Sequence, residues 1–351
     1  MKRSPSCLLF VFACTVAMPT AALRGLEPPG RRGRTQALDA RRLGDAQSAR
    51  AARPAVPQIE EPWWRVAGNP DLGELAGPNQ EPVDFAIWQA ADSTWQLWSC
   101  IRKTREPGHS RLFYRWEGRS LTEPNWRPMG IAMHADPRLG EQPGGLQAPY
   151  VIRADGRYYM FYGDWENICM AASDDGKRFE RLRIRGRGPQ LFGEGPGNKT
   201  RDPMALRIRD LWYCYYSAHG GEGGIFVRTS RDLLDWSTSR PRKVAAGGKA
   251  GAKWWNAECP HVVARDGSYY LFRTSRYTNP PTTTVYRSHD PVSFGVHDDS
   301  RIVSTLPVAA PEIILHNGQY YIASLTPTLN GIRIARLKWE PKSIVGGAKL
   351  H

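Results

Sequence analysis

The sequence predicts an all-β protein, a five-bladed β-propeller with four antiparallel strands in each blade. A strand-like phrase with a turn and two aromatic residues recurs five times along the 351 residues. A second, serine-containing phrase follows four of these copies in phase. The chain also contains 13 Trp, 14 Tyr and 10 Phe, and such large flat side chains can fill the wedges between blades. The two repeated phrases predict the fold, and the aromatic content agrees with it.

The first phrase follows a short β-rich segment and consists of a turn and a second strand, which is typical of a hairpin. Its copies are ADSTWQLW (91–98), ADGRYYMF (154–161), IRDLWYCYY (208–216), RDGSYYLF (265–272) and HNGQYYIA (316–323). In four copies a proline stands nine residues before the first aromatic residue. These prolines are Pro149, Pro203, Pro260 and Pro311. We expect each proline to mark the start of an inner strand.

The second phrase has the pattern Ser-x-[Asp/Thr]-x-x-x-[Trp/Phe]. It occurs at 120–126, 173–179, 230–236 and 288–294, so its starts are 53, 57 and 58 residues apart. A unit of roughly 50 to 60 residues with about four short strands has the size of a propeller blade. Five units fill residues 75–345, and the preceding EPWWRVAG (61–68) could complete the fifth unit and close the ring. A β-sandwich or β-helix of similar composition is the alternative fold.

Before the repeats, the sequence predicts a signal peptide (1–22) and a flexible linker (23–57), followed by the propeller domain (58–351). The first segment has two basic residues, an apolar run too short to span a bilayer, and small residues near its end. The linker carries eight arginines, three acidic residues and no aromatic residue. We expect a protein secreted to the periplasm or the extracellular space, with a lipid-anchored surface form as the alternative and no transmembrane segment.

The formal net charge is +14, and half of it belongs to residues 1–57. Such a chain could adhere to an acidic surface or polyanion, or the linker could simply be solvated; we expect no nucleic-acid partner. The four cysteines that follow the predicted signal have no CxxC spacing, which argues against a zinc knuckle. Their apolar, strand-like contexts predict buried thiols in preference to a disulfide.

Two carboxylates stand beside the repeated prolines, Asp202 directly before one and Glu258 two residues before the next. The inner strand of every blade runs along the central channel, so equivalent positions face one axial cavity. Asp84 lies in the corresponding stretch of the first unit and should join them, although it could instead be a turn or surface acid. Buried carboxylates are costly unless they are used or paired.

Converging acids fit two chemistries. Hard oxygen ligands could hold a metal ion. Alternatively, glycoside hydrolysis needs one carboxylic acid to protonate the leaving oxygen and one carboxylate on the far side of the anomeric carbon. A third carboxylate can hold substrate hydroxyls and raise the pKa of the acid by like-charge repulsion.

With these motifs the sequence resembles the five-bladed propeller glycoside hydrolases, the superfamily of families 32, 43, 62 and 68. RDP (201–203) and ECP (258–260) resemble the RDP and EC motifs of the β-fructosidases. QAPYV (147–151) is similar to the WAPDV phrase of family 43, whereas VDFAIW in the first unit matches neither family's signature. The resemblance covers roughly residues 75–345 and implies a divergent enzyme that is family 43-like or family 32-like.

The resemblance implies a glycosidase that cleaves O-glycosidic bonds of furanoside or pentoside type in an oligo- or polysaccharide. In that case Asp84 would be the nucleophile or general base, Asp202 the transition-state stabiliser and Glu258 the general acid. No metal ligand is assigned and no cofactor is required, but a structural cation could occupy the central channel.

Other polar and aromatic residues near the strand ends are expected to bind substrate, although each could instead have a packing role. These residues are Arg201, Trp88, Gln147, Asp164, Trp165, His219, Trp255, Asn256 and Arg276. Two alternative functions remain. One is a carbohydrate-binding propeller without catalysis, and the other is a scaffold built around an axial cation.

Overall fold

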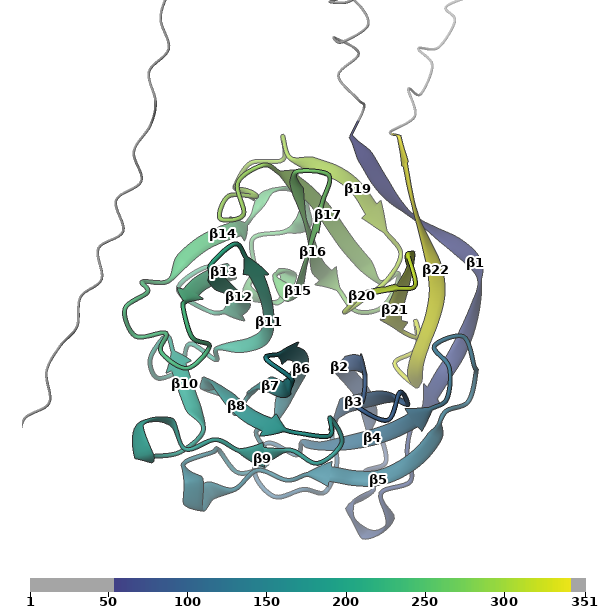
Figure 1. Ribbon diagram of the computed structural model, residues 1–351, viewed down its shortest axis with the longest axis vertical. Coiled ribbons are helices and arrows are strands. Elements are labelled where there is room, and N and C mark those ends of the chain that lie inside the picture. The colour runs from purple at the N-terminus through teal and green to yellow at the C-terminus, as the bar shows by residue number, and fades with distance from the viewer. Residues whose placement is uncertain (1–53, 342–351) are drawn as a thin grey trace, which may run out of the picture. The chain divides into compact units, whose positions relative to one another are not determined.

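The computed structural model describes residues 54–341, which form five β-sheets arranged in a ring (Figure 1). The innermost strands, β2, β6, β11, β15 and β20, surround the centre of the ring. The predicted five-bladed β-propeller is therefore confirmed. The predicted signal peptide and most of the predicted linker lie outside the described residues. In residues 54–341 no helix has the length and hydrophobicity needed to cross a membrane.

The strands of each of the first four blades follow one another in chain order from the channel outward. The first blade consists of β2 (Glu81–Gln89), β3 (Trp95–Arg102), β4 (Leu112–Gly118) and β5 (Arg127–Met133). The second consists of β6 (Gln147–Ala154), β7 (Arg157–Gly163), β8 (Asn167–Ser173) and β10 (Gln190–Gly193), with β9 (Glu180–Arg181) also paired to β8. The third consists of β11 (Arg201–Ile208), β12 (Leu211–Ala218), β13 (Gly224–Ser230) and β14 (Arg242–Ala246), with β18 (Gly295–Val296) added in parallel. The fourth consists of β15 (Glu258–Arg265), β16 (Ser268–Arg276), β17 (Thr282–Ser288) and β19 (Ile302–Leu306).

The fifth blade combines strands from both ends of the described chain. It consists of β20 (Glu312–His316), β21 (Gln319–Leu325), β22 (Gly331–Pro341) and β1 (Ala55–Gly68). Strand β1 pairs antiparallel with β22 from Ala55 opposite Pro341 to Gly68 opposite Gly331. The expectation that an N-terminal strand closes the ring is confirmed. The predicted linker boundary at residue 57 was placed too late, because residues 55–57 already pair with β22.

Helical structure in the described chain is limited to single turns of 3-10 helix. These are η1 (Gly73–Leu75), η2 (Pro137–Leu139), η3 (Ile184–Gly186), η4 (Gly248–Ala250) and η5 (Trp254–Asn256).

The serine-containing phrase forms a turn that directs an aromatic side chain between blades. In the third copy, the Asp232 carboxylate accepts hydrogen bonds from the backbone amides of Leu234 and Asp235, at 3.0 and 2.8 Å. The turn places Trp236, which is 1% exposed, against Phe161 of the second blade. The equivalent residues in the first and fourth copies, Trp126 and Phe294, are also buried. The repeated phrase therefore marks the packing between neighbouring blades.

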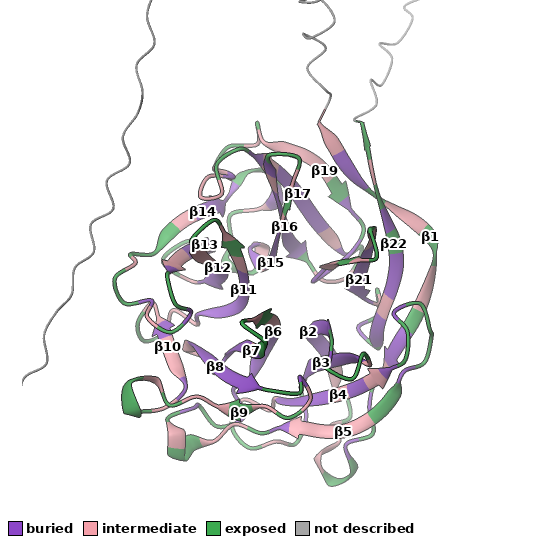
Figure 2. Ribbon diagram, viewed as in Figure 1, coloured by how far each residue is buried: buried purple, intermediate pink, exposed green. Residues whose placement is uncertain are grey.

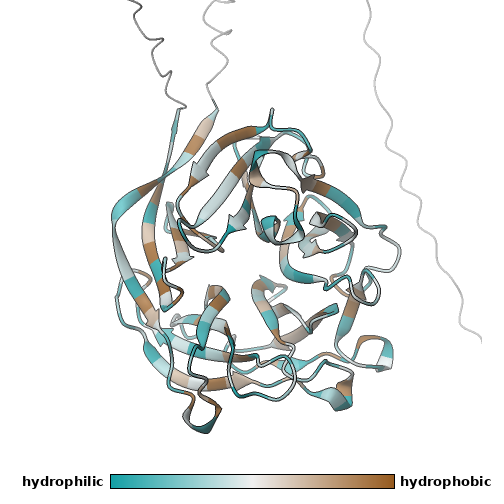
Figure 3. Ribbon diagram, turned by 180° about the vertical axis from the view of Figure 1, so that it is seen from behind, coloured by the Kyte–Doolittle hydropathy of each residue, from teal (hydrophilic) through white to brown (hydrophobic). Residues whose placement is uncertain are grey.

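Burial follows the strands, as expected for sheets stacked face to face around an axis. Buried residues run along the blades, whereas exposed residues concentrate in loops and turns (Figure 2). Apolar and polar segments alternate along many strands when the ring is viewed from behind (Figure 3). Cys100, Cys169 and Cys214 are buried free thiols and Cys259 is a half-buried one, which confirms the prediction of thiols in preference to a disulfide.

Candidate active site

Every blade has one residue in the left-handed backbone conformation where its chain enters the channel. These residues are Asp84 (φ 39°), Ala148 (φ 40°), Asp202 (φ 57°), Cys259 (φ 47°) and Ala310 (φ 48°). In the first four blades, the pairing of the inner strand with its neighbour shifts register at this residue. Asp84 and Asp202 therefore occupy equivalent positions, and Glu258 lies one position earlier, next to Cys259.

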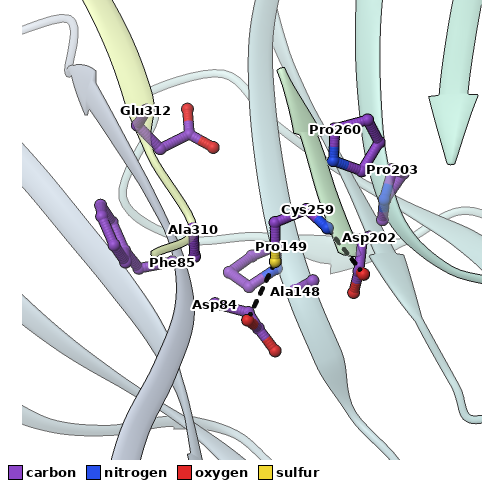
Figure 4. Close-up of a pocket in the computed structure, with 10 residues that line it drawn as sticks. All are labelled: Asp84, Phe85, Ala148, Pro149, Asp202, Pro203, Cys259, Pro260, Ala310 and Glu312. Atoms are coloured by element: carbon purple, nitrogen blue, oxygen red, sulfur yellow. Dashed lines mark hydrogen bonds between the residues drawn. The ribbon is translucent and has the colours of Figure 1, made fainter. Parts of the chain in front are cut away.

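A small cavity of about 20 Å³ lies between these five positions on the channel axis. Figure 4 shows it with the side chains of Asp84, Asp202 and Cys259 facing one another, while Glu312 lies on another side. Phe85 stands where the other blades have proline. This replacement explains why Asp84 could be aligned with Asp202 only approximately from the sequence.

Asp84 is buried and is held by two neutral donors. Its Oδ1 accepts hydrogen bonds from the Tyr277 hydroxyl at 2.7 Å and from the Cys259 thiol at 3.1 Å. Burial and the nearby charge of Asp202 raise the pKa of Asp84, whereas these hydrogen bonds oppose the rise. The Cys259 backbone amide donates to Asp202 Oδ2 at 3.0 Å, so one residue contacts both acids. A carboxylate oxygen from each acid and the Cys259 sulfur all lie within 4.8 Å of one another.

Glu258 forms a two-pronged ion pair with Arg201, a residue of the neighbouring blade. The Oε–N distances are 2.5 and 3.0 Å, and both side chains are buried. Burial raises the pKa of Glu258 to about 8, with a further contribution from the charge of Asp202, while Arg201 opposes the rise. Glu258 can therefore hold a proton at neutral pH.

A larger pocket of about 140 Å³ brings the three acids together with cationic and aromatic side chains. It is lined by Asp84, Arg102, Arg111, Gln147, Trp165, Lys199, Arg201, Asp202, His219, Trp254, Glu258 and Tyr277. Seven of the residues singled out in the sequence thus meet in one place, although Glu258, Asp202 and Asp84 come from three different blades. Two polar atoms in this lining, Gln147 Oε1 and His219 Nε2, have no hydrogen-bond partner within the described chain. Such unpaired buried atoms are suited to binding a ligand with hydroxyl groups.

Two of the expected binding residues, Trp88 and Asp164, lie away from this pocket and have structural roles. Trp88 is buried between the first two blades, where its Nε1 donates to the Gly176 carbonyl at 2.8 Å and its ring packs against Phe179. Asp164 is fully buried and accepts hydrogen bonds from the backbone amides of Glu166 and Asn167. Both side chains therefore organise the second blade and its border.

Three further candidates lie near the pocket in sequence but do not line it. Trp255 is half exposed and meets Trp254 edge to face. Asn256 donates from Nδ2 to the Ser275 carbonyl at 2.9 Å and fixes the loop after the 3-10 turn. Arg276 is exposed. The adjacent Trp254 and Tyr277 line the pocket instead.

Five lining residues were not anticipated from the sequence: Arg102, Arg111, Lys199, Trp254 and Tyr277. None of them belongs to the repeated phrases. Arg102 and Arg111 flank the loop between the second and third strands of the first blade, and Lys199 ends the Gly/Pro-rich loop 185–200. The only sequence signal was the presence of long loops directly before inner strands, which indicates a channel rim but not which side chains face it.

The comparisons with known proteins support the fold. No protein-family model matches the chain. Over 215 residues the chain is 26% identical to the sucrose-6-phosphate hydrolase of Bacillus subtilis, covering 58% of the chain and 41% of that protein. The match thus spans less than half of that relative's length.

Solved structures cover more of the chain. A thermostable family-43 glycoside hydrolase superposes with a TM-score of 0.55 at 17% identity, covering 81% of this chain and 99% of the other. An arabinanase from Bacillus subtilis gives a TM-score of 0.55 at 15% identity, covering 79% and 97% of the two chains. The chain has the fold of the five-bladed propeller glycoside hydrolases. An exo-1,5-α-L-arabinanase from a bovine ruminal metagenomic library also shares this fold, with a TM-score of 0.55 at 15% identity and coverage of 74% and 93%.

The cation expected in the channel stays a prediction. Among the described residues, Asp84, Asp202 and Cys259 form the group whose potential ligand atoms lie close enough together to surround an ion. Only two of the three ligands are the hard oxygen donors that alkaline-earth ions prefer.

Proposed function

We propose that the protein is a glycoside hydrolase that cleaves an O-glycosidic bond in the pocket formed by the first, third and fourth blades. The observation that carries this proposal is the meeting of three buried carboxylates, Asp84, Asp202 and Glu258, in one lining. Burial raises the pKa of one of them, Glu258, to about 8, which suits a general acid at neutral pH.

Glu258 is the general acid. With a pKa of about 8 it carries a proton below that pH and can give it to the oxygen of the departing group. Asp84 stands on the other side of the Cys259 thiol, and its two hydrogen bonds favour the ionised form. It acts on the anomeric carbon as nucleophile or on water as general base. Asp202 remains beside both and stabilises the positive charge that develops on the sugar ring.

The substrate is a furanoside or pentoside, bound through hydroxyl groups and the flat faces of aromatic rings. Trp165 and Trp254 both line the pocket and offer platforms for a sugar ring. Solved structures that share the fold include enzymes named as arabinanases. A pocket of about 140 Å³ suits one terminal sugar unit better than an extended polymer. We therefore propose release of single sugars from chain ends.

Hydrolysis of a panel of oligosaccharides and aryl glycosides by the full-length protein tests the proposal. Glu258→Gln and Asp202→Asn should each lower kcat/KM by about 10²- to 10⁴-fold. The control is Glu117→Gln, which changes a carboxylate paired with Lys177 outside the pocket and should leave kcat/KM within twofold. Glycosides with a dinitrophenyl leaving group need no proton, so Glu258→Gln should retain most of its activity on them.

Two results would contradict the proposal. Hydrolysis that persists in both variants on ordinary glycosides would reject the acid and stabiliser roles. Sugar binding by the wild type with no hydrolysis of any substrate would instead identify a carbohydrate-binding propeller.

A further inference from the structure

The geometry points to a substrate with an anionic substituent, a sugar carboxylate or a sugar phosphate, whose charge is bound by Arg111 and Lys199. This inference rests on the proposed function, because it names the substrate class of the same pocket. It follows from an imbalance of charge in the lining that the catalytic roles do not explain.

Four cationic side chains line the pocket, and two of them have an ionic partner. Arg201 lies 3.9 Å from the Asp202 carboxylate in addition to its contact with Glu258, and Arg102 reaches Glu81 at 2.6 Å. Arg111 and Lys199 differ, because no carboxylate in residues 54–341 lies within 4.0 Å of either one. The pocket therefore presents two half-buried positive charges that form no close ion pair within the described chain.

Both unpaired cations gather around one aromatic ring. The Arg111 guanidinium carbon lies 5.1 Å from the ring centre of Trp165, and Lys199 Nζ lies 5.4 Å from it. Lys199 Nζ also lies 6.0 Å from the ring centre of Trp254, which lines the same pocket. A sugar that stacks on either ring would bring its substituents within reach of these charges.

The backbone holds this arrangement in place at a conformational cost. Lys199 has φ 45° and Trp165 has φ 87°, both in the left-handed region that large side chains avoid. The Lys199 carbonyl accepts a hydrogen bond from Arg201 Nη1 at 2.8 Å, which ties the loop to the ion pair below it. Unfavourable backbone conformations that surrounding contacts enforce tend to mark binding and catalytic sites.

Two histidines report the positive potential of the same region. Burial, together with the charges of Arg201 and Lys199, lowers the pKa of His219 to about 4. His109, stacked on Trp165 with ring centres 3.9 Å apart, also has a lowered pKa, through burial and the charges of Arg111 and Lys199. Both rings are therefore neutral near pH 7 and add no positive charge to the region.

Catalysis alone accounts for only one of the two cations. The charge of Arg111 lowers the pKa of Asp84. Keeping Asp84 ionised would therefore be a sufficient role for Arg111 in catalysis. The charge of Lys199 is not among the largest influences on the pKa of Asp84 or Glu258. A substitution of Lys199 therefore distinguishes anion binding from a role in setting the pKa of the catalytic acids.

The test measures direct binding to the full-length protein by tryptophan fluorescence and by isothermal titration calorimetry. The probes are D-xylose, D-glucuronate, D-xylose 5-phosphate and inorganic phosphate, which separate the carboxylate from the phosphate source. At least one anionic sugar should bind about ten- to a hundredfold more tightly than xylose, since a charge-assisted contact replaces a neutral one. This preference should weaken between 50 and 500 mM NaCl, roughly as expected for partly exposed charges.

The variant is Lys199→Gln, which should remove most of the preference for the anionic sugar over xylose. The matched control is Lys243→Gln, whose ammonium lies 5.4 Å from the Phe226 ring and does not line the pocket. A preference for xylose 5-phosphate alone would assign a phosphate, and a preference for glucuronate alone a carboxylate. Equal binding of neutral and anionic sugars by the wild type, or a preference that Lys199→Gln leaves intact, would overturn the inference.

Binding needs no turnover, so the two proposals fail separately. Hydrolysis of neutral glycosides without any preference for anions would remove this inference and leave the glycosidase proposal standing. Lys199-dependent binding of an anionic sugar, with no hydrolysis of any glycoside, would support the anion site and reject the enzyme.

Discussion

The first and third blades differ from the second and fifth at one backbone position. All four blades enter the channel through a residue with left-handed φ, between 39° and 57°. Asp84 and Asp202 occupy this position in the first and third blades, and Ala148 and Ala310 occupy it in the second and fifth. The fold therefore needs the backbone conformation but not the carboxylate.

This difference separates what the repeat builds from what the site requires. A carboxylate buried at such a position is costly unless it is used, whereas alanine causes no such cost. The fourth blade lies between the two extremes, because Cys259 occupies the position and the acid has moved one residue back to Glu258. The ring thus supplies five equivalent backbone positions, and acidic side chains at or beside three of them provide the catalytic groups.

The largest effect is expected when the first blade is given alanine, the residue that the second and fifth blades have at this position. Asp84→Ala should lower kcat/KM by about 10³-fold or more, because it removes the group that acts on the anomeric carbon. The midpoint of thermal unfolding should stay the same or rise, because a buried charge is removed and alanine already occupies this conformation twice. An active variant, or one that is inactive only because it is unfolded, would contradict the comparison.

The second prediction concerns pH and the displaced acid of the fourth blade. A pKa of about 8 for Glu258 means that the acid loses its proton as pH rises through that value. For ordinary glycosides kcat/KM should therefore fall by about tenfold per pH unit above 8. Dinitrophenyl glycosides should show no such decline, and a decline shared by both substrate types would argue against Glu258 as the acid.

The third prediction tests the Cys259 thiol, which donates a hydrogen bond to Asp84. Cys259→Ala removes the S–H donor that opposes the rise in the pKa of Asp84. The acidic limb of the kcat/KM profile should move to higher pH, and activity at pH 5 should drop by roughly three- to tenfold. The matched control is Cys214→Ala, a buried thiol of β12 outside the pocket, which should leave the pH profile unchanged. An unshifted acidic limb in Cys259→Ala would show that the thiol does not tune Asp84.

The smallest effect is expected where the position is purely structural. Ala148→Gly and Ala310→Gly should each change the free energy of unfolding by less than about 1 kcal/mol. Relief of the left-handed backbone conformation and the greater flexibility of unfolded glycine nearly cancel. Urea unfolding measures the change, and kcat/KM should not move. Both methyl groups are buried and Ala310 belongs to the hydrophobic core, so a loss of several kcal/mol would mean that their packing outweighs the relief of the backbone.

Much of this architecture could be predicted from the sequence, since hairpin phrases and interblade aromatic residues repeat with fixed spacing. Residues adjoining the repeated prolines were also placed well: Asp202, Glu258 and Gln147 do face one pocket. Prediction failed where a side chain's direction depended on local geometry. Trp88 stands near a strand end but points into the blade border, and Trp254 replaced its neighbour Trp255 at the rim.

The cationic rim could not be predicted for a different reason. Arg111 and Lys199 come from loops of different blades, 88 positions apart in the sequence, and no repeat relates them. Their proximity depends on the closed ring and on loop conformations with left-handed residues. Such contacts are set by tertiary structure and leave no periodic pattern in the sequence.

The pairing of β1 with β22 has a consequence for how the protein is made. The first strand to leave the ribosome cannot find its partner until residues near position 341 have been synthesised. Until then an edge with free amides and carbonyls stays available to other chains. We therefore expect slow closure and a period of vulnerability to aggregation during biosynthesis, in which a chaperone that shields residues 55–68 would raise the yield of native protein.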